Sequence, residues 1–179
     1  MSIQVFILTK LMSGNTYPYK LKKELSQPVA LDQLSNITES KLYYHFESLQ
    51  KQGLIEVVEV LKEENRPDKH VYTITELGQL QLPEKIYELF EKSKIFGELI
   101  LPTISLQYVD VERVISILQE KVRKLEKKYA QLVAVQQHPT IHKEKLVGIT
   151  LFEQYIEQKF TDEIHYMERF IETLRANHT

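Results

Sequence analysis

The stretch ITESKLYYHFESLQKQGLIEVVEV, residues 37–60, decides how this chain folds. Its apolar residues Leu42, Phe46 and Leu49 recur at the spacing of one buried helix face. Gly53 predicts the end of that helix, and residues 54–61 alternate in the manner of a strand. The stretch therefore predicts a short helix followed by a strand.

The stretch RPDKHVYTITELGQ, residues 66–79, continues the pattern. A polar tip over residues 63–68 precedes a second expected strand at residues 70–74, and Thr75 opens a helix. Helix, stop, strand, charged tip and strand is the order of a winged helix-turn-helix. The exposed helix of that module fits the major groove of DNA, which is about 12 Å wide. We therefore expect a mainly α protein with a small β-wing, acting as a DNA-binding regulator rather than an enzyme.

Composition is compatible with a globular, cytoplasmic protein. The 179 residues allow one moderate domain or two small ones, and an apolar content of 42% suffices for a core. Cysteine is absent, which excludes disulfides and thiolate chemistry. No apolar run is long enough to cross a bilayer, and residues 1–12 lack the basic start and cleavage site of a signal peptide.

The net charge argues against the DNA-binding hypothesis. The whole chain carries a formal charge of −2, and residues 1–82 hold nine Lys and Arg against ten Asp and Glu. Nucleic-acid binders are usually basic, so an alternative is a protein-interaction module built on a winged helix without DNA affinity. A local patch of positive charge on the docking face can still suffice for DNA binding. The lysines expected around one face are Lys20, Lys22, Lys23, Lys41 and Lys51.

The remaining N-terminal elements are helices. Residues 3–12 and 17–25 are expected to be helical, with Leu21 and Leu25 facing inward, while the form of residues 29–36 is left open. Thr38 is expected to cap the third helix. Pro83 is expected to interrupt the helix that follows Thr75 and to begin another. We place the DNA-binding domain at residues 1–83 and a helical dimerisation domain at residues 84–179.

The second half predicts an antiparallel hairpin of two long helices. Asp110 opens the first, which ends at His138-Pro139, and the second runs over about residues 145–174. Alternating spacings of three and four make a heptad seam of Tyr108, Val111, Ile115, Leu118, Val122, Leu125, Tyr129 and Leu132. The seam could pack within its own domain, but its length favours pairing with a second copy. The predicted homodimer residues are Ile115, Leu118, Val122, Leu125, Tyr129, Leu132, Phe152, Ile156, Phe160 and Met167.

Several motifs together resemble the PadR family of bacterial transcription factors. They are Gly14 with YKLKKEL (19–25), KLY (41–43), GLI (53–55) and VYTITELG (71–78). In the second half, IFG (95–97) and LFEQY (151–155) resemble the longer members, which carry an extra helical dimerisation domain. The resemblance implies a winged helix-turn-helix regulator, usually a repressor, that binds double-stranded DNA as a homodimer.

The third helix supplies most candidate DNA contacts. Steps of 100° place Ser40, Tyr44, Ser48 and Lys51 opposite its apolar face. An exposed tyrosine in mid-helix makes Tyr44 the first candidate for base or sugar contact, although Tyr43 or Tyr44 could instead pack partly beneath the wing. Thr38, Ser40 and Tyr19 are candidate phosphate donors or plain capping and surface residues. The full set is Tyr19, Lys20, Lys23, Thr38, Ser40, Lys41, Tyr43, Tyr44, His45, Lys51, Lys62, Arg66 and Lys69.

Motifs for other chemistry are missing from the sequence. His138 and His142 have a metal-ligand spacing, but Pro139 breaks the helix that would align them. No phosphate-binding or nucleophile motif is present, so we expect no catalysis, cofactor or metal. Tyr and Phe side chains around residues 87–108 could line a pocket for a small apolar effector, or they could simply belong to the core.

Overall fold

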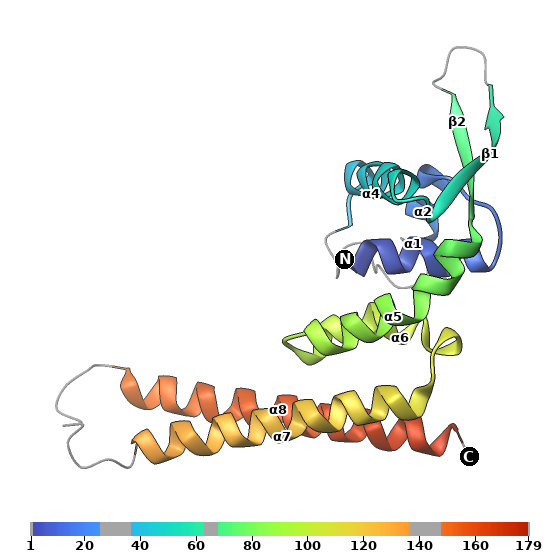
Figure 1. Ribbon diagram of the computed structural model, residues 1–179. Helices are drawn as coiled ribbons and strands as arrows, with labels where there is room; N and C mark the ends of the chain where they lie inside the picture. Colours follow the sequence, from blue (N-terminus) through green and yellow to red (C-terminus); the bar gives the residue numbers. More distant parts are fainter. Residues whose placement is uncertain (1, 26–36, 63–67, 137–147, 179) are drawn as a thin grey trace. The chain divides into compact units, whose positions relative to one another are not determined.

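The structure is a computed structural model that describes residues 2–25, 37–62, 68–136 and 148–178. It is mainly helical, with one two-stranded antiparallel sheet, as the sequence predicts (Figure 1). The chain divides into two compact units. Unit 1 comprises Met1–Leu89 and Leu101–Val109, and unit 2 comprises Phe90–Ile100 and Asp110–Thr179.

Three helices form the core of unit 1. Helix α1 (Ser2–Met12) is apolar on nearly all sides, and its Ile7 and Leu8 are fully buried. Helix α2 (Pro18–Leu25) and helix α4 (Glu39–Lys51) pack against each other, and α4 also packs against α1. The apolar faces predicted for the two helices are confirmed. Their buried residues include Leu21, Leu25, Leu42, Phe46 and Leu49.

A β-hairpin forms the wing. Strand β1 (Ile55–Leu61) pairs antiparallel with strand β2 (Lys69–Ile74), and a bulge falls between Val57 and Glu59. Thr16 adds a bridge to β2: its amide donates to the Tyr72 carbonyl at 3.2 Å and its carbonyl accepts from the Tyr72 amide at 2.9 Å. The loop before α2 is thereby tied to the base of the wing. The wing tip at residues 63–67 and the connector at residues 29–36 lie outside the described residues.

The base of the wing joins the next helix through Thr75. Its amide donates to the Leu54 carbonyl at 3.0 Å, and its hydroxyl donates to the Gly53 carbonyl at 2.7 Å. The same hydroxyl accepts from the Gly78 amide at 3.1 Å. Gly53 adopts a φ of +71°, a left-handed conformation that glycine permits at low cost. These contacts fix the end of α4, the start of β1 and the helix after Thr75 relative to one another.

The expected break at Pro83 is wrong. Helix α5 (Glu76–Lys92) runs through Pro83 without interruption. A proline inside a helix removes one backbone donor, a cost that buried side chains on either side can offset. Leu82 and Ile86, on the two sides of Pro83, are completely buried and anchor the helix across it.

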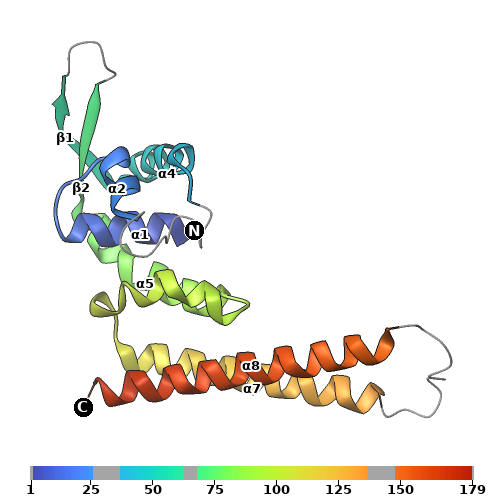
Figure 2. The same cartoon turned by 180° about the vertical axis from the view of Figure 1, so that it is seen from behind.

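Unit 2 is built around a helical hairpin. Helix α7 (Val111–Gln136) and helix α8 (Ile149–Ala176) run antiparallel, side by side (Figure 2). Asp110 caps α7, since its carboxylate accepts from the Glu112 amide at 3.0 Å. Helix α8 begins at Ile149, after Gly148 with a φ of +93°, and its expected start at about residue 145 lies outside the described residues. Shorter elements precede the hairpin, namely η1 (Phe96–Leu99), α6 (Ile100–Thr103) and η2 (Leu106–Tyr108).

Much of the predicted seam is buried within the single chain. Ile115, Leu118 and Val122 of α7 are buried, as are Phe160 and Met167 of α8. The Tyr129 and Phe160 rings stack at 5.6 Å between centroids. Intrachain packing, which the sequence left as the second interpretation, therefore accounts for this part of the seam. Among the described helices, none combines the length and the apolar composition that a bilayer crossing requires.

Candidate nucleic-acid interface

Helix α4 begins with the cap that the sequence predicts. The Thr38 backbone is extended, with φ −92° and ψ 160°, and its side-chain oxygen accepts from the Lys41 amide at 3.3 Å. Such a bond satisfies one of the amides that a helix N-terminus leaves unpaired. Thr38 is therefore an exposed capping residue, and a hydroxyl that accepts one hydrogen bond can still donate another.

The outward face of α4 carries an exposed tyrosine. Tyr44 is 67% exposed, although a ring of this size gains from burial. Ser40, Lys41 and Lys51 are exposed on the same helix. The arrangement offers a ring, a hydroxyl and cations, the groups that contact bases, sugars and phosphates.

His45, a candidate DNA contact from the sequence, lies at the edge of this face. Its ring is half-buried and meets the Tyr44 ring edge-on at 5.2 Å. Within the described residues its Nδ1 atom is buried without a hydrogen-bond partner. Burial, with the positive charge of Lys41 in support, lowers the pKa of His45 below its usual 6.5. His45 is therefore neutral at pH 7 and adds no positive charge to the face.

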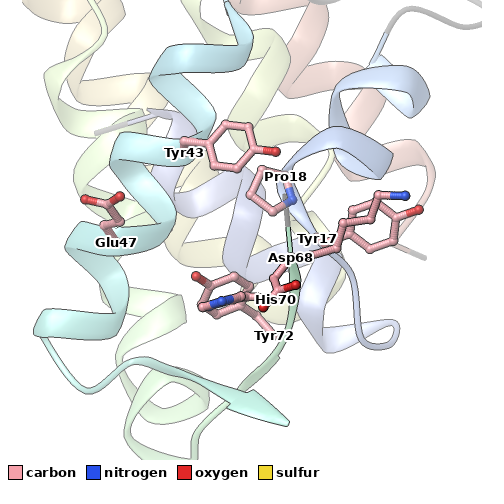
Figure 3. Close-up of a pocket in the computed structure, with 8 residues that line it drawn as sticks. Tyr17, Pro18, Tyr43, Glu47, Asp68, His70 and Tyr72 are labelled. Carbon is pink, nitrogen blue, oxygen red and sulfur yellow. The ribbon is translucent and has the colours of Figure 1, made fainter. Parts of the chain in front are cut away.

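Tyr43 lies on the opposite edge of α4, against the base of the wing. It lines a cavity of about 200 Å³ together with Tyr17, Pro18 and Tyr72 (Figure 3). Burial and the nearby Glu39 raise the pKa of Tyr43, while the Lys69 charge acts in the opposite direction. Of the two tyrosines on α4, Tyr43 is 45% exposed and lines the cavity beside β2, and Tyr44 is 67% exposed.

The other predicted contact residues flank α4. Tyr19 is 53% exposed on α2, and Lys20 and Lys23 are exposed beside it. Lys62 is exposed at the end of β1, whereas Lys69 is half-buried, with its ammonium 5.9 Å from the centre of the Tyr17 ring. Arg66 lies outside the described residues.

Two residues of this region departed from the sequence-based expectation. Ser48 is not on the free face, because it is half-buried and its hydroxyl accepts from the Gln4 side chain of α1 at 3.2 Å. Glu47 was missed, although it is exposed beside the cavity. Its spacing of four from Tyr43, which puts the two on one helix edge, was the signal available.

The predicted dimerisation residues range from buried to exposed. Five are buried within the chain, and Leu125, Tyr129 and Ile156 are half-buried in the hairpin. Leu132 is 36% exposed and Phe152 is 70% exposed. Phe152 has two apolar neighbours on α8, Leu151 and Tyr155, that are also exposed. We call Leu151, Phe152 and Tyr155 the α8 patch.

Aromatic residues at 87–108 mostly serve the core rather than a pocket. Tyr87 and Phe90 are buried. Phe96 stacks on Tyr166 at 5.6 Å, and its amide donates to the Glu163 carboxylate at 2.6 Å. Tyr108 does border an apolar cavity of about 500 Å³ in unit 1. A small apolar effector therefore stays a prediction.

Unit 1 has the architecture of a winged helix-turn-helix protein, with α4 as its exposed helix and the β1–β2 hairpin as its wing. Residues 7–84 match the model of the transcriptional regulator PadR-like family. Residues 7–84 are thus similar to the PadR-like family of transcriptional regulators, the resemblance that the motifs at residues 14–78 predict.

Solved structures show similarities over nearly the whole chain. Bacillus subtilis PadR in complex with operator DNA is 15% identical with a TM-score of 0.44, covering 97% of this chain and 99% of that one. A protein of Streptococcus mutans is 17% identical with a TM-score of 0.41, covering 97% and 96%. A PadR-like regulator from Bacillus cereus is 17% identical with a TM-score of 0.40, covering 97% and 96%. Among proteins with curated descriptions, none matches the sequence.

Proposed function

We propose that this chain is a sequence-specific DNA-binding regulator that binds a palindromic operator as a homodimer and represses transcription. The observation that carries the proposal is the exposed face of α4, with Tyr44 at its centre, on a winged helix of a regulator family. The Tyr44 ring is 67% exposed beside the exposed Ser40 and Lys41, so the face offers a ring, a hydroxyl and a cation to a partner.

The contacts divide by chemistry. Helix α4 would lie in the major groove, where Tyr44 and Ser40 contact bases or sugars. Lysines would contact phosphates and set the position of the domain without reading sequence. The phosphate-contacting set comprises Lys20, Lys23, Lys41, Lys51 and Lys62, with Tyr19 and Thr38 as hydroxyl donors.

The homodimer is proposed to form through unit 2. The α8 patch is apolar and exposed, which supports its burial against a second copy. A two-fold dimer would present two copies of α4 roughly 34 Å apart, one turn of B-DNA, so the operator would be an imperfect palindrome. Repression would follow from a dimer that covers a promoter.

The first test is a gel-shift titration on the promoter of the protein's own gene against random DNA of equal length. Tyr44→Ala should reduce the preference for the promoter by roughly tenfold, because it removes a base or sugar contact. Lys51→Ala should weaken binding to both DNAs and lower the salt slope by about one unit.

Lys127→Ala is the matched control for Lys51→Ala, because Lys127 is an exposed lysine of α7 in unit 2. It should leave the salt slope unchanged. A wild-type protein that does not bind DNA, or that binds both DNAs equally, would contradict the proposal. Either result would favour the alternative, a protein-interaction module on a winged helix.

A further inference from the structure

The cavity between α2, α4 and β2 has walls that suit a cation. Three tyrosine rings line it, from Tyr17, Tyr43 and Tyr72. Two carboxylates, Glu47 and Asp68, also line it, together with the basic side chains of Lys69 and His70. Aromatic faces attract ammonium groups through the negative charge on their π surface, and neighbouring carboxylates strengthen the attraction.

The cavity floor is held in place by the fold. The Tyr72 ring packs against the buried Phe46 ring at 5.0 Å between centroids. The Tyr72 backbone is fixed by its two hydrogen bonds with Thr16. A preformed wall lowers the cost of ordering a site when a ligand binds.

One cation of the chain already lies at this wall. The Lys69 ammonium is 5.9 Å from the centre of the Tyr17 ring, and its charge also acts on Tyr43. The Glu47 charge reaches Tyr72 and raises the pKa of that phenol after burial. The charges of Lys69 and Glu47 thus both act on tyrosines that line the cavity.

We propose that this cavity binds a small organic cation, an amine or quaternary ammonium compound. A phosphate of DNA is a poor occupant, because Glu47 and Asp68 would repel it. The ligand's charged group lies among the three rings, near Glu47, and competes there with Lys69. This site is separate from the contacts of Tyr44 with DNA, although Tyr43 and Lys69 are among the DNA contacts that the sequence predicts.

The test is calorimetric titration of the full chain with choline and with its neutral isostere 3,3-dimethyl-1-butanol. Choline should bind at least about tenfold more tightly, since the two differ in charge and hardly in shape. Equal affinities, or no binding of choline, would overturn the proposal.

Two substitutions are expected to change the affinity for choline in opposite directions. Glu47→Gln should weaken choline binding by about threefold to tenfold, because it removes a neighbouring negative charge. Lys69→Met should strengthen binding, because it removes the competing ammonium and keeps a side chain of similar length. Glu59→Gln is the matched control, an exposed acid on β1 away from the cavity, and should have no effect. Weaker binding by Lys69→Met, or equal effects of Glu47→Gln and Glu59→Gln, would refute the site.

A second readout rests on the proposed function: saturating choline should weaken operator binding, because the cavity shares residues with the DNA-facing surface. The choline titration of the free protein does not depend on DNA at all. If choline binds and DNA does not, the proposed function fails while the cation site stands. If DNA binds and choline does not, the cation site fails alone.

Discussion

His45 occupies the boundary between the core of unit 1 and the exposed face of α4. Its half-buried ring lies beside the exposed Tyr44, and its Nδ1 atom is enclosed. When the ring is protonated, its positive charge is poorly solvated and is repelled by the positive charge of Lys41. The charged form is therefore penalised in the folded state and not in the unfolded chain.

That penalty predicts a pH-dependent stability. The folded pKa lies below 6.5, so as pH falls through about 6.5 the unfolded chain binds the proton first, and the folded state loses stability. The urea midpoint should fall between about pH 7.5 and about pH 5.5, and His45→Gln should make that fall smaller. His165→Gln, which removes an exposed histidine of α8, is the matched control for the loss of one imidazole elsewhere in the chain. Identical pH profiles for both variants would show that His45 is not responsible.

At the scale of elements, the junction between the wing and α5 depends on a close approach at Gly78. A Cβ atom built there would lie 2.2 Å from the Leu54 carbonyl oxygen and 2.7 Å from the Ile74 side chain. The first of these neighbours is backbone and cannot rotate away. The first turn of α5 can therefore approach the start of β1 and the end of β2 this closely only where a residue has no side chain.

Gly78→Ala should accordingly destabilise unit 1 by about 1–3 kcal/mol, the usual cost of overpacking. Gly97→Ala is the matched control, because a Cβ at Gly97 meets nothing within 4 Å. Urea unfolding followed by circular dichroism gives both values. A Gly78→Ala protein as stable as Gly97→Ala would mean that the junction relaxes at little cost.

On the scale of the whole molecule, the helical hairpin contains apolar residues that are buried within the chain and others that are exposed. Phe160 and Met167 hold α8 against α7, so changes there would disrupt the hairpin itself. The α8 patch is exposed in the single chain, so changes there test assembly without disturbing that packing. Substitutions in the patch are thus the sharper test of the proposed homodimer.

Phe152→Asp should convert the proposed homodimer to a monomer and weaken operator binding in parallel, because two half-sites would no longer be held by one particle. Light scattering after gel filtration measures the mass, and circular dichroism checks that the helices persist. Gln154→Asp adds a charge at an exposed position on a different side of α8 and should leave the mass unchanged. A monomeric wild type, or a dimeric Phe152→Asp protein, would contradict the proposed role of the patch.

The sequence by itself determined the features that local rules control. Apolar spacing located the buried faces of α2 and α4, Thr38 predicted a cap, and Gly53 predicted a helix end, all confirmed. Each of these depends on residues within about one or two helical turns, where backbone geometry and hydrogen bonding decide the outcome. For the same reason the order of helices and strands in unit 1 was predictable.

Only the tertiary structure decided the features that depend on distant neighbours. Pro83 stays inside α5 because buried side chains on both sides hold the helix, which no local rule predicts. A seam with spacings of three and four has the same pattern whether it packs on its own chain or on another. Periodicity therefore could not decide whether Ile115 packs within the chain or against a second copy. Likewise, Tyr43 and Tyr44 are adjacent in sequence and both are exposed, but Tyr43 lines the cavity beside β2 because the wing returns next to its edge of α4.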